Sequence, residues 1–288
     1  MHRGTPAHDR AVDAVGWQTR SGSKSGFTLV ELLVVLVIIG MLASMVGFAM
    51  FRSMQAAREA KTQALISKLH NVIVRHWDTF ETGQIPFTAS ESDPTDDDRL
   101  NAVREWMRYE MPDKAADLGV PQLLYNDDPQ TKLIDRPLTN TVINDMGGIS
   151  GNAPTDAQCL YRLATLLADD DLDRINLFSE NETKDVNGDG TPDIFIDGWG
   201  QPIRFIRWPA GLVTDIQDCN STTSPDPFDP TGIGSGYALF PLIYSHGPDK
   251  QGLMPNPTGT SDPFANTYTA TSDDNDNIHN HRLNARLQ

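Results

Sequence analysis

Side chains that can offer oxygen ligands occupy alternate positions in one short segment, residues 185–193. Glycines at positions 188 and 190 allow the chain to turn sharply between these ligands. Calcium takes about six to eight oxygen atoms, including backbone carbonyls such as the one expected at Thr191. The segment therefore predicts a calcium-binding loop with these candidate ligands: Asp185, Asn187, Asp189, Thr191 and Asp193.

The loop lacks one ligand of a complete EF-hand. Where a bidentate glutamate would close such a loop, the chain has Ile196, so Asp197, another loop or water would have to complete the shell. The alternative is a metal-free polar turn, because Asn-Gly and Asp-Gly dipeptides form turns without metal. Calcium is the interpretation that we favour.

Other reactive side chains do not form a catalytic set in the sequence. Ser245 and His246 are adjacent, so they point in different directions, and Cys159 has no evident histidine partner. Phosphate-binding glycine loops, HExxH and paired CxxC motifs are absent from the sequence. His279 and His281 lie near acids and could bind a transition metal, but a mobile polar tail is the preferred interpretation. The sequence therefore predicts a protein that is not an enzyme.

Two cysteines, Cys159 and Cys219, are the only ones in the chain. An oxidising compartment outside the cytoplasm would permit one disulfide between them. Two separate buried thiols are a nearly equal alternative, because spacing alone does not show whether the two Cα atoms approach closely enough.

One long apolar segment, Phe27–Phe51, precedes all of these candidate residues. Its only charge is Glu31, and as a helix it would be roughly 37 Å long at about 1.5 Å per residue, enough to cross a bilayer. Proline is absent from residues 27–81, and apolar residues continue at helical spacing beyond the span. The pattern predicts one continuous helix over residues 27–81, with Gly40 and Gly47 as candidate bending points. Two histidines on this helix are interpreted as surface residues: His70 and His76.

A polar, net basic stretch precedes this helix and stops abruptly at Gly26. An ordinary secretory signal has a shorter apolar region and is cut after it, whereas here the candidate cut lies before the apolar helix. The basic side chains keep residues 1–26 on the cytoplasmic side, so the remainder of the chain faces outward.

The run Gly26-Phe27-Thr28-Leu29-Val30-Glu31-Leu32 and the apolar residues after it resemble the leader junction of type IV prepilins, shared by type IV pilins and type II secretion pseudopilins. The resemblance implies that a prepilin peptidase removes residues 1–26, cutting between Gly26 and Phe27, and N-methylates Phe27. It also implies that Glu31 pairs with the new amino terminus of a neighbouring subunit during filament assembly. A lone carboxylate in an apolar membrane helix costs a few kcal/mol, so Glu31 needs such a cation.

The head that follows the helix divides by composition. Residues 82–182 read as an acidic loop and helical insertion, with one helix near Arg99–Met111 and a second that Thr155 or Asp156 caps. Residues 183–288 have short β-type runs separated by glycine and proline. The expected strands form a small antiparallel sheet and lie in these segments: Asp193–Ile196, Ile203–Trp208 and Tyr237–Tyr244. The fold class predicted is α+β and pilin-like.

Two head segments, Asp197–Phe205 and Tyr244–Asp249, resemble strand and turn motifs of the type II secretion major pseudopilins. That resemblance implies a second calcium ion shared by Asp249 and two of three acids downstream. The spacer to these acids is longer than in the family, so a solvated acidic tail is the equal alternative. The three downstream acids are Asp273, Asp274 and Asp276.

The net charge of the head distinguishes between its possible functions. Residues 82–288 hold 33 of the 39 acidic side chains and 14 of the 23 lysines and arginines, so this part is strongly acidic and binding to nucleic acid is not expected. The leading interpretation is a single-pass inner-membrane pseudopilin with a periplasmic or external head, whose partners are the prepilin peptidase, other pseudopilin subunits and the secretion machinery. The alternatives are a minor type IV pilin with a surface-binding head and, less favoured, a membrane-anchored periplasmic enzyme.

Overall fold

A computed structural model describes these residues of the chain: 26–83, 95–114, 117, 155–169, 177–232, 234, 236–252, 263–264 and 276–282. The chain divides into two compact units, Met1–Arg52 and Ser53–Gln288. The helices are α1 (Leu29–Thr82), α2 (Asp96–Glu110), α4 (Thr155–Asp169) and two short 3-10 helices, η3 (Glu180–Glu182) and η5 (Asn280–Arg282). The strands are β1 (Thr183–Lys184), β2 (Ile194–Phe195), β3 (Arg204–Ile206), β4 (Leu242–Ser245) and β5 (Ile278–His279).

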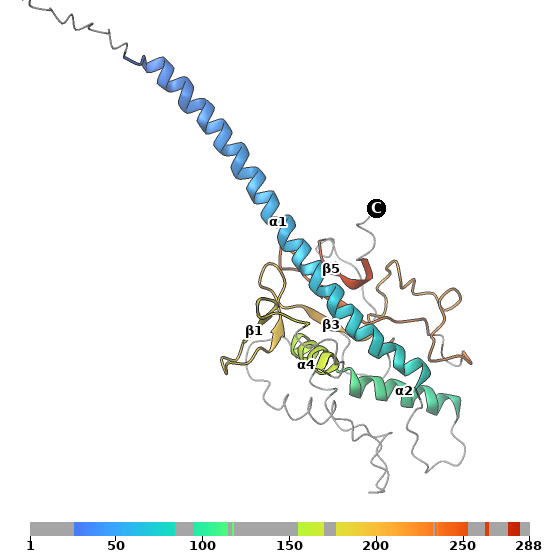
Figure 1. Cartoon of the computed structure of the whole chain (residues 1–288). Helices are drawn as coiled ribbons and strands as arrows, with labels where there is room; N and C mark the ends of the chain where they lie inside the picture. The colour runs from blue at the N-terminus through green and yellow to red at the C-terminus, as the bar shows by residue number, and fades with distance from the viewer. Residues whose placement is uncertain are drawn as a thin grey trace, which may run out of the picture. The chain divides into compact units, whose positions relative to one another are not determined.

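The long helix that the sequence predicts is confirmed. α1 is continuous over 54 residues, from Leu29 to Thr82 (Figure 1). Gly40 and Gly47 lie within it, and the space beside each is open, with nothing within 4 Å of an added Cβ. In the first unit the apolar side chains are exposed, for example Leu29 at 80% and Met45 at 71%. α1 is the one helix among the described residues that is long and apolar enough to cross a membrane.

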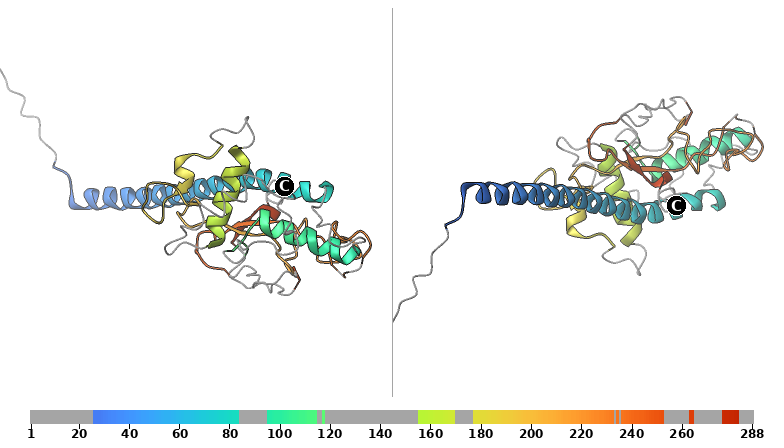
Figure 2. Two further views of the ribbon diagram at one scale, coloured as in Figure 1. Left: turned by 90° about the horizontal axis from the view of Figure 1, so that it is seen from below. Right: turned by 90° about the horizontal axis from the view of Figure 1, so that it is seen from above.

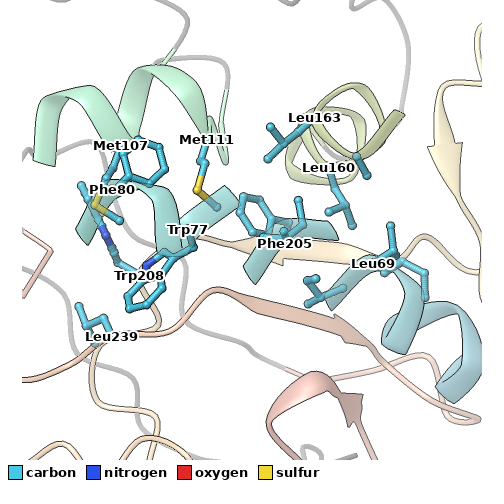
Figure 3. Close-up of a cluster of buried hydrophobic side chains, with 14 of the residues drawn as sticks. Leu69, Trp77, Phe80, Met107, Met111, Leu160, Leu163, Phe205, Trp208 and Leu239 are labelled. Carbon is cyan, nitrogen blue, oxygen red and sulfur yellow. The ribbon is translucent and has the colours of Figure 1, made fainter. Parts of the chain in front are cut away.

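The second half of α1 contributes buried side chains to the hydrophobic core of the head. Leu69, Trp77 and Phe80 lie on one face, at separations of three, eight and eleven residues, and are at most 4% exposed. Figure 3 shows these side chains pointing into one cluster with Met107 from α2 and Leu163 from α4. Each large side chain buried in this way contributes roughly 1.5–3 kcal/mol, so the core fixes this half of α1 to the head.

Local capping explains where α2 begins. Thr95 is the N-cap: its hydroxyl accepts a hydrogen bond from the Asp98 backbone N–H, and the Asp98 carboxylate accepts one from the Thr95 backbone N–H. The helix therefore starts at Asp96, three residues before the predicted start at Arg99, and it ends at Glu110 before Pro112. Three aspartates in its first turn also favour the positive end of the helix dipole.

The strands form two small antiparallel sheets, where the sequence predicts one. β1 pairs with β2, and a three-stranded sheet has the order β3-β4-β5. α4 packs on β2 and β3, and Figure 2 shows it running across the direction of α1. The strands are shorter than the predicted runs, and Tyr237 forms only an isolated bridge, with Pro225.

The prediction of a mobile polar tail is wrong for residues 276–282, which contain β5. His279 and His281 are only 4% and 2% exposed. Asn280 explains the docking: its Oδ1 accepts from the Ile243 N–H at 2.9 Å, and its Nδ2 lies 2.8 Å from the Pro241 carbonyl and 3.0 Å from the ring of His70. One side chain thus ties the tail to β4 and to α1. The prediction that His70 and His76 are surface residues is wrong, because His70 is half-buried and bonded to Asn280, and the His76 side chain is 11% exposed beside Glu110.

Candidate functional site

The leader junction lies at the start of α1. Nothing comes within 4 Å of an added Cβ at Gly26, and Phe27 is 83% exposed, so the predicted cleavage bond is accessible. Thr28 donates from its backbone N–H to Glu31 Oε2 at 2.8 Å and from its hydroxyl at 2.9 Å. In return, the Glu31 N–H donates to the Thr28 hydroxyl at 3.2 Å.

These reciprocal bonds make Thr28 and Glu31 a capping box for α1. Glu31 therefore closes the first turn of its own helix, a role that sequence analysis missed. The signal was visible, because Thr-x-x-Glu before an apolar run is the pattern of a capping box. The carboxylate lies at the positive end of the helix dipole, close to where cleavage at Phe27 would create an ammonium group.

The candidate calcium loop, residues 185–193, connects the paired strands β1 and β2. Asp185 accepts from the backbone N–H of Gly188 at 2.6 Å and of Gly190 at 2.8 Å. Asp193 Oδ2 accepts from the N–H of Val186 at 3.1 Å and of Asn187 at 3.2 Å. Gly188 and Gly190 have φ values of 80° and 92°, in the left-handed region that favours glycine.

Three of the predicted ligands converge in this loop. The Asn187 amide nitrogen lies 3.0 Å from Asp189 Oδ2 and 3.4 Å from Asp193 Oδ1, so one side chain lies within reach of two carboxylates. Thr191 donates to Asp189 from its hydroxyl and from its backbone N–H at 2.8 Å, and these bonds lower the pKa of Asp189. Within the described residues, no group of three or more histidine, cysteine or acidic side chains is arranged to hold a metal ion. The oxygen-rich donor set still suits calcium, which stays a prediction.

Asp197, the expected replacement for the missing ligand, is occupied elsewhere. It is 1% exposed, its Oδ1 accepts from the backbone N–H groups of Trp199 and Gln201 at 2.8 Å each, and its Oδ2 accepts from the Ser245 hydroxyl at 2.6 Å. These bonds leave Asp197 out of the 185–193 loop. They join the two head segments that resemble the pseudopilin motifs, since Ser245 belongs to Tyr244–Asp249.

The same junction contacts α1 very closely. Gly198 donates from its N–H to the Thr62 hydroxyl at 2.9 Å, and an added Cβ at Gly198 would lie 2.4 Å from the Arg58 carbonyl oxygen. Trp199 Nε1 donates to Gln55 Oε1 at 3.0 Å. Only glycine fits at position 198, so the sequence Asp-Gly-Trp-Gly allows this turn to pack directly against the backbone of α1.

The second predicted calcium site is only partly described. Asp249 is exposed and accepts from the Gln251 N–H at 2.8 Å. Asp276 lies against the same turn, because an added Cβ at Gly247 would be 2.4 Å from its carbonyl oxygen. Two of the predicted ligands, Asp273 and Asp274, lie outside the described residues. The second ion stays a prediction.

The disulfide that the cysteine count allows is not formed, and both cysteines are free thiols. Cys159 is buried in α4, where burial and the nearby charge of Asp113 raise the pKa of its thiol. Cys219 lies in a turn with a φ of 55° and donates to the Leu212 carbonyl at 3.4 Å. The structure thus shows the second of the two alternatives that the sequence left open, two separate thiols, although Cys219 is half-buried rather than buried.

Sequence analysis missed a buried charge cluster around Arg207, which is 1% exposed. Its Nη2 lies 3.0 Å from Asp117 and 3.7 Å from Asp113, and its Nη1 donates to the Met111 carbonyl at 2.6 Å. Burial raises the pKa of Asp113 to about 6. Burial acts in the same direction at Asp117, but the charge of Arg207, the hydrogen bond with Asp113 and the charges of Lys114 and Arg108 together lower the pKa of Asp117. No sequence signal links position 207 to residues 111–117, so only the fold could show this cluster.

The fold and the junction together define a class of protein: an α+β pilin-like fold, with a long N-terminal apolar helix and small antiparallel sheets. Residues 22–47 match the family model described as the prokaryotic N-terminal methylation motif. No curated protein and no solved structure matches the chain. The chain thus carries a type IV prepilin-like leader, which is of the kind processed by a prepilin peptidase before assembly with other pilin subunits. The match covers the leader junction and the first part of α1, and not the head.

Proposed function

We propose that this chain is a pseudopilin, a structural and non-enzymatic subunit of a type II secretion filament. In this proposal a prepilin peptidase cuts between Gly26 and Phe27 and methylates Phe27. The mature subunit spans the inner membrane once, with its head in the periplasm, until it joins the filament. The observation that carries the proposal is Glu31, a lone charge in an apolar helix directly after a matched prepilin leader.

The choice of a pseudopilin over a pilin is supported by the head. The two segments that resemble pseudopilin motifs meet in one buried junction through Asp197 and Ser245, 2.6 Å apart. The same junction contacts α1 through the hydrogen bond from Gly198 to Thr62, so both segments belong to the part of the head that packs against this helix. A minor type IV pilin with a surface-binding head is the alternative.

Replacing the chromosomal copy with a Gly26→Val variant tests the proposal in cells. We expect unprocessed chain in the membrane, no subunit in sheared filaments and loss of exported proteins from the medium, with surface adhesion unchanged. The wild-type chain should begin at methylated Phe27 by intact mass. Loss of adhesion with normal export would favour the minor pilin, and a wild-type chain that starts elsewhere would overturn both.

Calcium is proposed for the 185–193 loop, where the cation would be held by the carboxylates of Asp185, Asp189 and Asp193, the side-chain carbonyl of Asn187 and the backbone carbonyl of Thr191. In the structure Asp185 and Asp193 accept from backbone N–H groups of the loop and the three carboxylates are not grouped around one point, so binding requires the loop to rearrange. The oxygen ligands at alternate positions and the left-handed glycines support this assignment. Just before the loop, Lys68 Nζ forms a salt bridge with Glu182 Oε1 at 2.7 Å, and Lys61 Nζ donates a hydrogen bond to the Asn181 carbonyl at 2.7 Å. A cation in the loop would therefore stiffen a hairpin that is tied to α1.

A further inference from the structure

Trp199 is the one tryptophan among the described residues that is not buried. Its indole is half-buried at the edge of the core, whereas the other three are at most 5% exposed: Trp77, Trp106 and Trp208. Its position is rigid, because Asp197 accepts from the Trp199 backbone N–H at 2.8 Å and Gly198 is pressed against the backbone of α1. Several buried contacts therefore hold a partly exposed apolar ring in one position.

The place where Trp199 is held is set by its bond to Gln55. Gln55 lies four residues beyond Phe51, the end of the apolar run, which is about 6 Å along the same helix. The headgroup layer on each side of a bilayer is roughly 5–8 Å thick, from a total of about 40–45 Å around a core of about 30 Å. The apolar run of roughly 37 Å is longer than the core, and such helices match the core by tilting. When residues 27–51 match the core in this way, Gln55 lies about 5 Å beyond it, so its contact with Trp199 falls at the depth of the lipid headgroups.

We propose that Trp199 and Arg58 form a membrane-interface contact, through which the head rests on the phospholipid headgroups before assembly. The chemistry suits that layer, where tryptophan is enriched because its ring is apolar and its one polar atom needs a partner. Here Gln55 already accepts from that atom at 3.0 Å, so the ring can enter the interface without leaving a donor unpaired. The backbone of Arg58 packs against Gly198, the residue before Trp199, and the Arg58 side chain is exposed, so it offers a cation to lipid phosphates. This inference rests on the membrane-anchored state of the proposed function.

The test uses the mature chain, residues 27–288, in vesicles of equal parts phosphatidylcholine and phosphatidylglycerol. Brominated lipids carry the quencher either near the headgroup end of the acyl chains or at their far end, and tryptophan emission reports contact. We expect the shallow bromines to quench the wild-type protein more than the deep ones. Trp199→Phe should lose that shallow quenching. Trp77→Phe is the matched control, because its buried indole N–H has no hydrogen-bond partner, and it should keep the quenching.

Insertion is checked separately by carbonate extraction of the same vesicles, so a failure of membrane anchoring is distinguishable from a failure of the contact. The wild-type depth profile does not depend on whether either variant folds. An inserted wild-type protein with no shallow quenching, or Trp199→Phe with undiminished quenching, would overturn the proposal. If quenching of Trp199 by the shallow bromines is lost at low protein-to-lipid ratios and the ring is protected from water only at high ratios, the proposal would also be overturned. That result would favour a contact between subunits.

Discussion

Replacing Asp117 by asparagine should destabilise the head more than any other single loss of charge in the described residues. Asp117 is fully buried and accepts from Arg207 at 3.0 Å and from Arg108 at 3.1 Å. Asparagine keeps the shape but removes the negative charge, so among the described residues the buried Arg207 keeps one acidic partner, Asp113, at 3.7 Å. Breaking a buried pair from one side costs about 3–5 kcal/mol, because the remaining charge is desolvated and uncompensated.

For a unit of this size each kcal/mol lowers the melting temperature by about 2–4 °C, so Asp117→Asn should lower it by roughly 10 °C. Thermal unfolding of the mature chain in detergent, followed by circular dichroism, measures the shift. Asp78→Asn is the control, since it removes an exposed acid from the same unit and should change stability by less than about 0.5 kcal/mol. Adding Arg207→Met to Asp117→Asn should recover part of the loss, because it removes the stranded charge. A double variant no more stable than Asp117→Asn would refute the reasoning.

Four further outcomes follow from the geometry. Glu31→Gln should leave membrane insertion intact but reduce incorporation into sheared filaments when it is the sole copy, and unchanged incorporation would show that its charge is dispensable. Millimolar calcium should raise the melting temperature of the wild-type chain and have less effect on Asp189→Ala; no thermal shift in the wild type would make the loop a metal-free turn. Burial lowers the pKa of His279 to about 4 and of His281 to about 3. Because the folded state keeps both rings neutral, their contribution to stability is full above about pH 6.5 and is lost as the pH falls toward 4. The protection factor of the β5 amides, which corrects their exchange rate for the intrinsic effect of pH, should fall over that range, and a protection factor that does not change with pH would contradict this. Gly198→Ala should lower the melting temperature by several degrees, because its Cβ would lie 2.4 Å from a carbonyl of α1, and an unchanged midpoint would show that the contact yields easily.

Local signals explain which elements the sequence predicts correctly. The proline-free apolar run and the helical spacing predict α1 to within two residues at each end, because a long periodic segment carries many consistent positions. The capping box at Thr28 was readable in the same way. Strands of two to four residues are too short for periodicity, so β1 and β5 escaped prediction. The pairing of Arg207 with Asp117 joins segments 90 positions apart, and no local pattern encodes it.

The contacts of the head with α1 are spread along the helix rather than gathered at one point. Hydrogen bonds and ion pairs from four separate head segments reach successive turns of α1, at these positions: Gln55, Thr62, Lys68, His70 and His76. Gln55, Lys68 and His76 are roughly 12 Å or more apart along the helix and contact different head segments. Contacts more than about 7–10 Å apart and without shared partners contribute additively, so losing one of these three leaves the others in place. In the proposed function, a force on the head during assembly would therefore be shared among several contacts with α1. This distribution supports the proposed role of α1 as the assembly helix, because the head does not depend on any one of these contacts to hold it.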